Sequence, residues 1–436
     1  MTTHMLTRPR RLNGTIAIPG DKSVSHRAIL FNALADGSAA IQNFLPGADC
    51  LSSIACMRAM GVTIEQQGTT VHVHGVGLHG LREPTDLLDC GNSGTTLRLL
   101  AGLLAGMPFF SVLSGDASLR SRPQRRVVEP LRALGASIDG RAQGDRAPLA
   151  IRGTVIHGGE WELTVASAQV KSALLLAALS GDAPLRLHGR IDSRDHTERM
   201  LSAMGVALQC TSDQILLTPP THLTPLSLEV PGDPSSAAFW WVAAAIHPAA
   251  EVTTTGVCLN PTRTGALDVL QAMGANITIS KERIAGNEPV GDVTVRSSHL
   301  HATEVGGAII PRLIDEIPIL SLAAACAAGT TTFYDAQELR AKETDRIATV
   351  VAGLHALGVA AEARSDGLVV RGHAGATFKG ATLASHNDHR LAMTWAVAAL
   401  IANAETHITD ADAVAVSYPT FWDTLQDITS DVHLSR

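Results

Sequence analysis

MRAMGVTI (57–64) is a short segment that the chain repeats along its length. The apolar spacing of each copy is typical of a helix end, which a glycine closes before alternating apolar residues begin a strand. The repeated glycines are 74, 70, 69 and 84 residues apart, so they recur almost in frame. The further copies are LRALGASI (131–138), LSAMGVAL (201–208), LQAMGANI (270–277) and LHALGVAA (354–361), with FWDTLQDI (421–428) as a diverged sixth candidate.

A second series of segments alternates with the first. Each member is an apolar helix that begins in a turn of polar and small residues. With both series, the unit has about 70 residues, two helices and several short strands, and it occurs six times. Helices that alternate with strands predict an α/β or α+β fold. The members are 20–35, 91–105, 166–179, 232–246, 314–328 and 387–402.

Two matching turns indicate that the six units form two halves. Pro19-Gly20-Asp21-Lys22-Ser23 is echoed by Pro231-Gly232-Asp233-Pro234-Ser235, 212 residues later, which is the length of three units. We therefore expect two globular domains of three units each, with a cleft between them.

Composition excludes several classes of function. Of 436 residues, 45% are hydrophobic and 17% charged, and the net charge of −7 argues against a general nucleic-acid or anionic-membrane surface. The start of the chain, MTTHMLTRPRRLNG, lacks the apolar run of a signal peptide, and the apolar segments are too short to span a bilayer. The six cysteines have no metal-ligand spacing, so we expect buried thiols in a reducing cytoplasm.

Basic and polar side chains gather at the starts of the apolar helices, where free N–H groups favour anions. The segment 339–358 predicts a helix with Lys342 and Arg346 in its first turn, although the helix dipole disfavours cations there. An anion between the two cations would resolve this conflict. The gathered residues are Lys22, Ser23, Arg27, Asn92, Gly94, Thr95, Arg98, Arg120, Arg122, Arg125, Arg126, Ser167, Gln169, Lys171, Asp315, Glu316, Asp388, His389 and Arg390.

Structural roles are open for single members of this set. Ser23, Asn92, Thr95 and Ser167 are also ordinary helix caps, and Arg122 suits an exposed basic loop. His389 is more often a packing or capping residue than a catalyst. Neither VHVHG (71–75) nor DSRDHTER (192–199) has the geometry of a metal site, so no metal or cofactor is expected.

The set as a whole resembles the enolpyruvyl transferases, and among them the 3-phosphoshikimate 1-carboxyvinyltransferase (EPSP synthase) family. The resemblance implies an inside-out α/β barrel of two domains with three βαβαββ units each, helices inside and sheets outside. The implied domains are 22–233 and 1–21 plus 234–436, with the active site in the interdomain cleft. The matching stretches are 19–30, DCGNSGTTLRLL (89–100), RSRPQR (120–125), ASAQVKSALLLA (166–177), RDHTERML (194–201), LIDEIPIL (313–320), LRAKETDRI (339–347) and NDHRLAM (387–393).

The family reaction joins the 5-hydroxyl of 3-phosphoshikimate to phosphoenolpyruvate and releases phosphate, which needs an acid, a base and cations for two polyanions. By resemblance, Asp315, Glu343 and Lys22 are catalytic. The implied contacts of 3-phosphoshikimate are Lys22, Ser23, Arg27, Ser167, Ala168 (through its backbone), Gln169, Arg194, Asp315 and Lys342. The implied contacts of phosphoenolpyruvate are Lys22, Asn92, Gly94, Arg122, Gln169, Arg346 and Arg390.

The chain departs from some family members at two positions. Glu338 replaces an asparagine before the KETDR segment, and Val416 and Ser417 stand where a lysine precedes the C-terminal aromatic-proline pair. Gly94 leaves room for phosphoenolpyruvate or the inhibitor glyphosate, so we expect sensitivity to glyphosate in a monomeric, cytoplasmic enzyme.

Three rival functions are weaker. A UDP-N-acetylglucosamine 1-carboxyvinyltransferase is the nearest alternative, but that family uses a loop cysteine that GDASLRSRP (115–123) lacks. An RNA 3′-phosphate cyclase would require a basic nucleotide-binding surface, which the acidic net charge disfavours. A non-enzymatic repeat scaffold would leave the cations of the buried helices unexplained.

Overall fold

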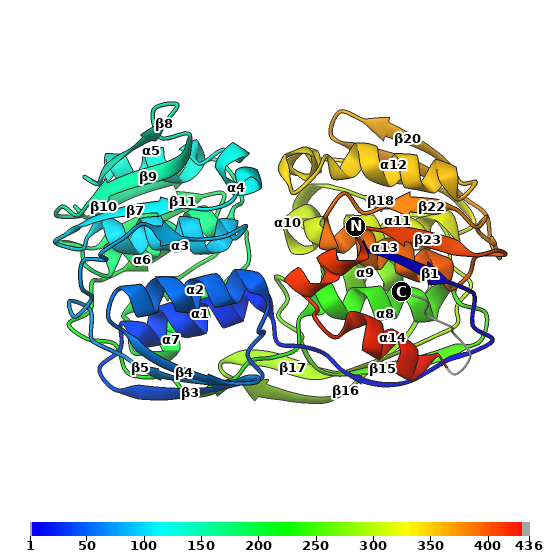
Figure 1. Ribbon diagram of the computed structural model, residues 1–436, viewed down its shortest axis with the longest axis horizontal. Helices are drawn as coiled ribbons and strands as arrows, with labels where there is room; N and C mark the ends of the chain where they lie inside the picture. The colour runs from blue at the N-terminus through cyan, green and yellow to red at the C-terminus, as the bar shows by residue number, and fades with distance from the viewer. Residues whose placement is uncertain (1, 430–436) are drawn as a thin grey trace. The chain divides into compact units, whose positions relative to one another are not determined.

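The computed structural model describes residues 2–429 and divides them into two compact units (Figure 1). Of the described residues, one unit comprises Gly20–Pro231 and Ile284–Glu288, and the other comprises 2–19, Gly232–Arg283 and 289–429. The chain passes from one to the other at the Pro-Gly steps of the two matching turns. The boundaries expected from the resemblance, 21/22 and 233/234, lie two residues further along.

The unit around 20–231 contains three four-stranded sheets, ordered β14-β3-β5-β4, β6-β7-β9-β8 and β10-β11-β13-β12. Its strands are β3 (Ser38–Gln42), β4 (Thr63–Gln67), β5 (Thr70–His74), β6 (Leu88–Asp89), β7 (Phe110–Ser114), β8 (Ser137–Arg141), β9 (Arg146–Arg152), β10 (Gly159–Leu163), β11 (Leu185–Gly189), β12 (Leu208–Cys210), β13 (Gln214–Leu217) and β14 (Leu228–Glu229). Its helices are α1 (Lys22–Ala33), α2 (Ala48–Ala59), α3 (Gly94–Ala105), α4 (Ala117–Ser121), α5 (Arg125–Ala133), α6 (Ala168–Ala178) and α7 (His196–Ala203).

The other unit also contains three sheets, ordered β16-β17-β15-β2, β18-β19-β21-β20 and β1-β23-β22. Its strands are β1 (Thr3–Leu6), β2 (Leu12–Ala17), β15 (Ala250–Cys258), β16 (Asn276–Ala285), β17 (Glu288–Arg296), β18 (Glu304–Val305), β19 (Gly329–Phe333), β20 (Ala360–Arg364), β21 (Gly367–Gly372), β22 (Thr382–Ala384) and β23 (Thr406–Thr409). Its helices are α8 (Pro234–Ile246), α9 (Gly265–Ala272), η1 (Gly307–Ile309), α10 (Ile310–Leu313), η2 (Ile314–Glu316), α11 (Ile317–Ala325), η3 (Gln337–Ala341), α12 (Arg346–Ala356), α13 (His389–Ala399), η4 (Ala411–Val416) and α14 (Phe421–Ile428).

The sheets mix parallel and antiparallel pairs in the same way. In the sheet of β6 to β9, β6 runs parallel to β7, while β7 and β8 both run antiparallel to β9. The sheets of β10 to β13 and of β18 to β21 repeat this pattern. Helix α3 joins the parallel strands β6 and β7, as such crossovers require. The predicted mixed α/β fold class is confirmed.

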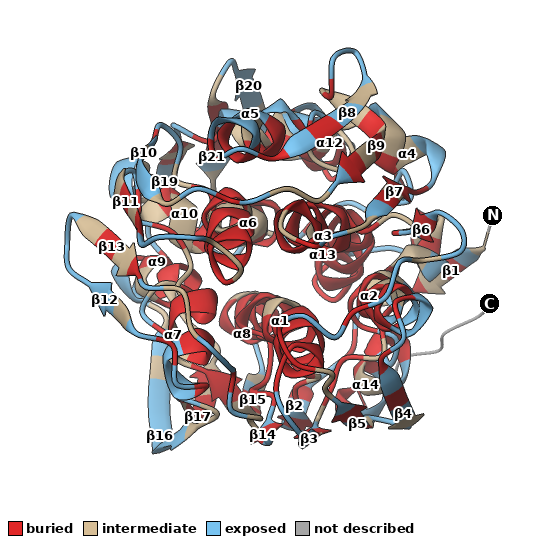
Figure 2. Ribbon diagram, turned by 90° about the vertical axis from the view of Figure 1, so that its left-hand side faces the viewer, coloured by how far each residue is buried: buried red, intermediate tan, exposed pale blue. Residues whose placement is uncertain are grey.

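Six helices carry most of the interior. Figure 2 colours α1, α3 and α6 of the first unit almost wholly as buried, and α8, α11 and α13 of the second unit have the same burial. These are the helices that the sequence predicted from apolar runs with polar starts. The polar starts also act as caps, since Asp21, Ser93, Asp233 and Asp388 each accept a hydrogen bond from a backbone N–H of the first turn.

The repeated glycines end the helices of the first series as predicted. Gly61, Gly135, Gly205, Gly274 and Gly358 have φ between 85° and 100° directly after α2, α5, α7, α9 and α12. This left-handed conformation is open to glycine without the steric cost that a Cβ atom adds. The sixth candidate segment forms α14, which begins at Phe421.

Two predictions from the sequence are wrong. The helix expected over 339–358 begins only at Arg346, because Asp345 caps it and residues 337–341 form the separate 3₁₀ turn η3. Lys342 is therefore outside the helix, in an extended conformation.

The cysteines are not all buried, since Cys210 at the end of β12 is exposed. Within residues 2–429, no helix has the length and apolar character needed to cross a membrane.

Candidate active site

The first two turns of α1 carry two of the predicted cations in different environments. Lys22 is partly exposed and donates to Asp49 Oδ2 at 3.1 Å. Arg27 is 2% exposed, and its guanidinium donates to Thr197 Oγ1 and Ser172 Oγ, both at 2.7 Å. Burial lowers the pKa of Arg27 to about 10, which still leaves it a cation at neutral pH. Ser23 follows Lys22 in the first turn and is half-buried.

The turn before α3 contacts the arginine of the 120–125 segment. Arg122 ends α4 and donates to Asn92 Oδ1 at 2.5 Å and to the Asn92 carbonyl at 3.3 Å. The amide of Asn92 in turn donates to Asp116 Oδ2 at 2.7 Å. The structure therefore brings Asn92 and Arg122 together, and Gly94 opens the helix two residues later.

The other arginines of the basic segment have structural partners. Arg125 is exposed and pairs with Glu129 at 3.1 Å, one turn along α5. Arg120 donates to the Gly115 carbonyl. Within this segment it is Arg122 that contacts another predicted site residue, Asn92.

Arg98 links α3 to α6 and was predicted only as a polar helix-start residue, without a site role. Its Nη1 donates to Gln169 Oε1 at 2.6 Å and its Nε to Gln124 Oε1 at 3.0 Å. The Gln169 amide donates onward to Thr95 Oγ1 at 3.0 Å. Arg98 lies four residues after Gly94, so both residues are on one face of α3. This spacing could have identified Arg98 as a site residue.

The start of α6 and the loop before α7 hold the remaining predicted residues of this unit. Ser167 is the N-cap of α6, but its side chain makes no capping hydrogen bond, and Ala168 begins the helix. Arg194 is half-buried in the loop between β11 and α7. Ser193 beside it was not predicted as a site residue. Its hydroxyl is buried and has no hydrogen-bond partner among residues 2–429.

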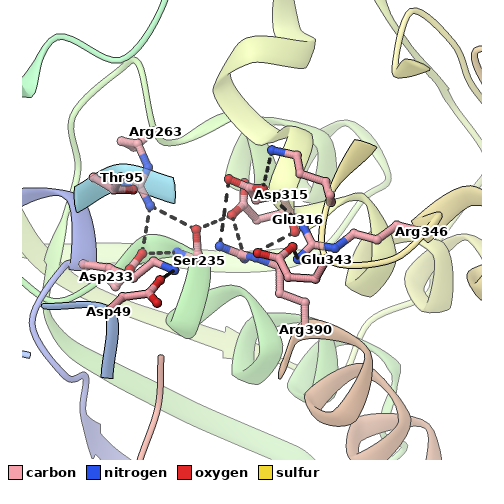
Figure 3. Close-up of polar contacts among 12 residues, drawn as sticks. Asp49, Thr95, Asp233, Ser235, Arg263, Asp315, Glu316, Glu343, Arg346 and Arg390 are labelled. Carbon is pink, nitrogen blue, oxygen red and sulfur yellow. Dashed lines mark hydrogen bonds and ion pairs between the residues drawn. The ribbon is translucent and has the colours of Figure 1, made fainter. Parts of the chain in front are cut away.

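Asp315 is the centre of the predicted residues in the other unit. Its carboxylate lies 3.2 Å from Lys342 Nζ, 3.4 Å from Arg346 Nη1 and 3.9 Å from Arg390 Nη2. These groups come from η2, the segment after η3, and the starts of α12 and α13. Figure 3 shows Arg346 and Arg390 converging on Asp315. Three predicted cations thus surround one predicted, partly exposed carboxylate.

Arg346 is the most enclosed cation of this cluster. It is 1% exposed and donates to both carboxylate oxygens of Asp388, at 2.8 and 3.1 Å, and to Glu343 Oε2 at 2.6 Å. Burial lowers the pKa of Arg346, but the carboxylates of Asp388, Glu343 and Asp315 together raise it above its ordinary value. Arg346 is therefore a permanent, fixed cation.

The structure changes the explanation for the neighbouring cations Lys342 and Arg346. The sequence placed both in the first turn of one helix and predicted a bound anion between them. In the structure Asp315 itself contacts both, and Lys342 lies outside the helix. The protein supplies part of the anionic charge that the sequence assigned to a ligand alone.

A second polar group extends this cluster through Glu316 and Arg390, and it adds Ser235 and Arg263, which the sequence did not indicate as site residues. Ser235 donates to Glu316 Oε1, and Arg390 Nη1 lies 3.5 Å from the same oxygen. Arg263 donates to Ser235 Oγ at 3.0 Å and to Asp233 Oδ1 at 2.8 Å (Figure 3). Glu316 and Arg263 are 2% exposed, so this group orients Arg390 from behind.

The arrangement is suited to anion chemistry with proton transfer. Arginines fixed by carboxylates can hold phosphate and carboxylate groups without reorganisation, and Asp315 and Glu343 are available as acid or base. Among residues 2–429, no group of three or more His, Cys, Asp and Glu side chains could hold a metal ion.

The model of the family described as EPSP synthase (3-phosphoshikimate 1-carboxyvinyltransferase) matches residues 6–425. A protein of Chloroflexus aggregans named 3-phosphoshikimate 1-carboxyvinyltransferase is 68% identical over 436 residues, covering 99% of this chain and 100% of that protein. A protein of the same name from Roseiflexus sp. is 68% identical and covers 98% of this chain and 99% of its own length. A solved structure of the EPSP synthase from Acinetobacter baumannii superimposes with a TM-score of 0.89 at 40% identity, covering 100% of both chains. The chain described here belongs to the EPSP synthase family.

Proposed function

We propose that this chain transfers the enolpyruvyl group of phosphoenolpyruvate to the 5-hydroxyl of 3-phosphoshikimate, giving 5-enolpyruvylshikimate 3-phosphate and phosphate. The observation that carries the proposal is the Asp315 carboxylate, in contact with Lys342, Arg346 and Arg390. A carboxylate can accept the proton of the attacking alcohol, and the cations beside it can hold the polyanionic partner. The reaction is a step of the shikimate pathway, which leads to chorismate and the aromatic amino acids.

The chemistry is an addition followed by an elimination. Asp315 accepts the proton of the 5-hydroxyl as its oxygen bonds to the enol carbon, and the methylene carbon takes a proton to give a tetrahedral intermediate. The bond to the phosphate oxygen then breaks, phosphate leaves, and the methyl group returns a proton. Glu343 and Lys22 are the proposed partners in these proton transfers. The two nearest cations, Lys342 and Arg346, keep Asp315 ionised and in position before it accepts the proton.

The binding roles follow the resemblance and are supported by the contacts within each unit. For 3-phosphoshikimate they are Lys22, Ser23, Arg27, Ser167, Ala168, Gln169, Arg194, Asp315 and Lys342. For phosphoenolpyruvate they are Lys22, Asn92, Gly94, Arg122, Gln169, Arg346 and Arg390. Val416 at the end of η4 cannot supply the fifth cation that some family members have.

The proposed site lies in a cleft between the domains 22–233 and 1–21 plus 234–436. The proposed architecture is an inside-out α/β barrel of six βαβαββ units, three per domain. The six buried helices and the recurring sheet pattern support it, because the sheets of β6 to β9, β10 to β13 and β18 to β21 each pair a parallel crossover strand with a hairpin. We propose a monomer of the cytoplasm, supported by six cysteines that are all free thiols.

The alternative acceptor, UDP-N-acetylglucosamine, is not favoured. The similar proteins carry the name 3-phosphoshikimate 1-carboxyvinyltransferase, and the turn from Gly115 to Pro123 has no cysteine.

The test is phosphate release from phosphoenolpyruvate with each acceptor in turn. We expect turnover with 3-phosphoshikimate alone, and a drop in kcat of roughly 100- to 10,000-fold in Asp315→Ala, as for the loss of a general base. The control is Asp268→Ala, which removes a carboxylate 2.7 Å from Arg312 on a half-exposed surface and should leave turnover unchanged. Full activity of Asp315→Ala would refute the role of this carboxylate.

A further inference from the structure

A buried lysine lies directly behind the start of α6. Lys171 is 1% exposed, and its Nζ is 2.6 Å from Glu198 Oε1 on α7. The same Nζ donates to the carbonyls of Ile191 and Ser193, at 3.1 and 3.2 Å. An ammonium group has three N–H donors, so these contacts use all of them.

These contacts attach a loop to a helix. Residues 190–195 connect β11 to α7, and the two carbonyls that Lys171 binds lie in this loop, the second one next to Arg194. Ser167, Ala168 and Gln169 open the helix that carries Lys171. The lysine therefore fixes the distance between the loop and the helix start, which together supply the proposed phosphate contacts of 3-phosphoshikimate.

Glu198 provides the charge that a buried ammonium requires. Its carboxylate also acts on Arg27, raising a pKa that burial lowers, while the neighbouring Arg194 opposes it. The hydroxyls of Ser172 and Thr197, next in sequence to Lys171 and Glu198, lie 2.6 Å apart and both accept from Arg27. Helices α1, α6 and α7 thus share one hydrogen-bonded network behind the proposed pocket.

We propose that Lys171 is a positioning residue, which holds the 190–195 loop so that Arg194 meets the phosphate of 3-phosphoshikimate. Glu198 acts as its counter-charge. Both side chains are enclosed, so neither touches substrate. The proposal rests on the proposed function for the identity of the ligand.

Two variants separate positioning from stability. Lys171→Met with Glu198→Leu removes both charges and keeps the volume, a change that is often neutral for a buried pair, but it leaves the two carbonyls without their donor. We expect it to fold, with a melting temperature lowered by the two unsatisfied carbonyls but less than in Glu198→Gln, where a buried ammonium loses its counter-charge. Its KM for 3-phosphoshikimate should rise about tenfold, as for one misplaced charge-assisted hydrogen bond, with kcat and the KM for phosphoenolpyruvate little changed.

Glu198→Gln should give the reverse pattern. It keeps an acceptor for Lys171 and leaves the carbonyl contacts in place, but it removes the charge. We expect lower stability and a KM for 3-phosphoshikimate close to that of the wild type. The control is Arg132→Met on α5, which removes a side chain bound to the Ile138 carbonyl at 2.7 and 2.9 Å and should leave every kinetic constant unchanged.

Hydrogen exchange of the 190–195 amides gives a readout without substrate. Faster exchange is expected in the double variant and not in Glu198→Gln. An unchanged KM for 3-phosphoshikimate in a folded double variant would overturn the proposal. If the double variant does not fold, Lys171→Gln, which keeps one amide donor, is measured in the same way, and an unchanged KM overturns the proposal equally. Absence of turnover in the wild type with 3-phosphoshikimate would instead reject the proposed function, and the exchange data would still report whether Lys171 holds the loop.

Discussion

At the residue scale, Gly94 lies directly against the side chain of Arg98. A Cβ atom there would lie 2.7 Å from Arg98 Nη1, which is itself held by Gln169. A methyl group must therefore displace the guanidinium and weaken its contact with Gln169, so its effect extends beyond direct blocking of a ligand.

We predict that the wild type is inhibited by glyphosate and that Gly94→Ala raises the inhibition constant by at least about tenfold, or ~1.4 kcal/mol. Steady-state inhibition at fixed 3-phosphoshikimate measures this. Arg98→Lys serves as the comparison, because it moves the cation without adding a methyl group. A wild type that is already resistant contradicts the prediction.

His26 on α1 predicts a dependence of stability on pH. Burial lowers its pKa from 6.5 to about 3, and its Nδ1 lies 2.8 Å from Ser53 Oγ. The folded state excludes a proton that the unfolded chain binds, so the stabilisation is complete above pH 6.5 and is lost as the pH falls towards 3. Each unit of pKa difference corresponds to about 1.4 kcal/mol.

Urea unfolding at a series of pH values should therefore show a shallower loss of stability in acid for His26→Asn than for the wild type. His79→Asn, at an exposed position, is the control and should keep the wild-type slope. Parallel curves for His26→Asn and the wild type would show that His26 does not resist protonation.

At the scale of elements, the contact of α3 with α6 depends on Gly102. A Cβ atom at this position would lie 2.1 Å from the Ala173 carbonyl oxygen. Gly102→Ala must separate the two helices, whose starts carry Gly94 and Gln169. We expect a loss of stability of about 1–3 kcal/mol, as for overpacking, and higher KM values for both substrates.

The shift of the urea unfolding midpoint in Gly102→Ala measures this loss of stability. Because the clash is with backbone, adding Ala173→Gly should not restore stability. Recovery in that double variant would mean that side chains, and not the backbone, set the distance between the helices.

The elements also show where inference from sequence failed. The periodic apolar residues of 346–357 predicted the body of α12, because burial of one face is a local pattern. Its start was misplaced by seven residues, since Asp345 is a cap and Lys342 is drawn to Asp315, which lies 27 residues earlier in the chain. Long-range ion pairs leave no periodic signal.

At the scale of the whole molecule, we predict that 3-phosphoshikimate closes the proposed cleft. Anions shared by cations of both units would draw the units together. Small-angle scattering should then show a smaller radius of gyration with 3-phosphoshikimate than without it, and inorganic phosphate is the control ligand. Superimposable curves with and without 3-phosphoshikimate would contradict closure.

The sequence by itself determined the helices, their glycine ends, the mixed α/β class and the family, because apolar periodicity, glycine conformation and the motif residues are local properties. It also indicated the residues of the candidate site. Only the tertiary structure decided which charges meet. Asp388 neutralises Arg346, Glu316 supports Arg390, and Lys171 binds a loop 20 residues away, all through contacts between segments distant in the chain. The energy of a buried charge depends on its partners in space, and the order of residues does not specify them.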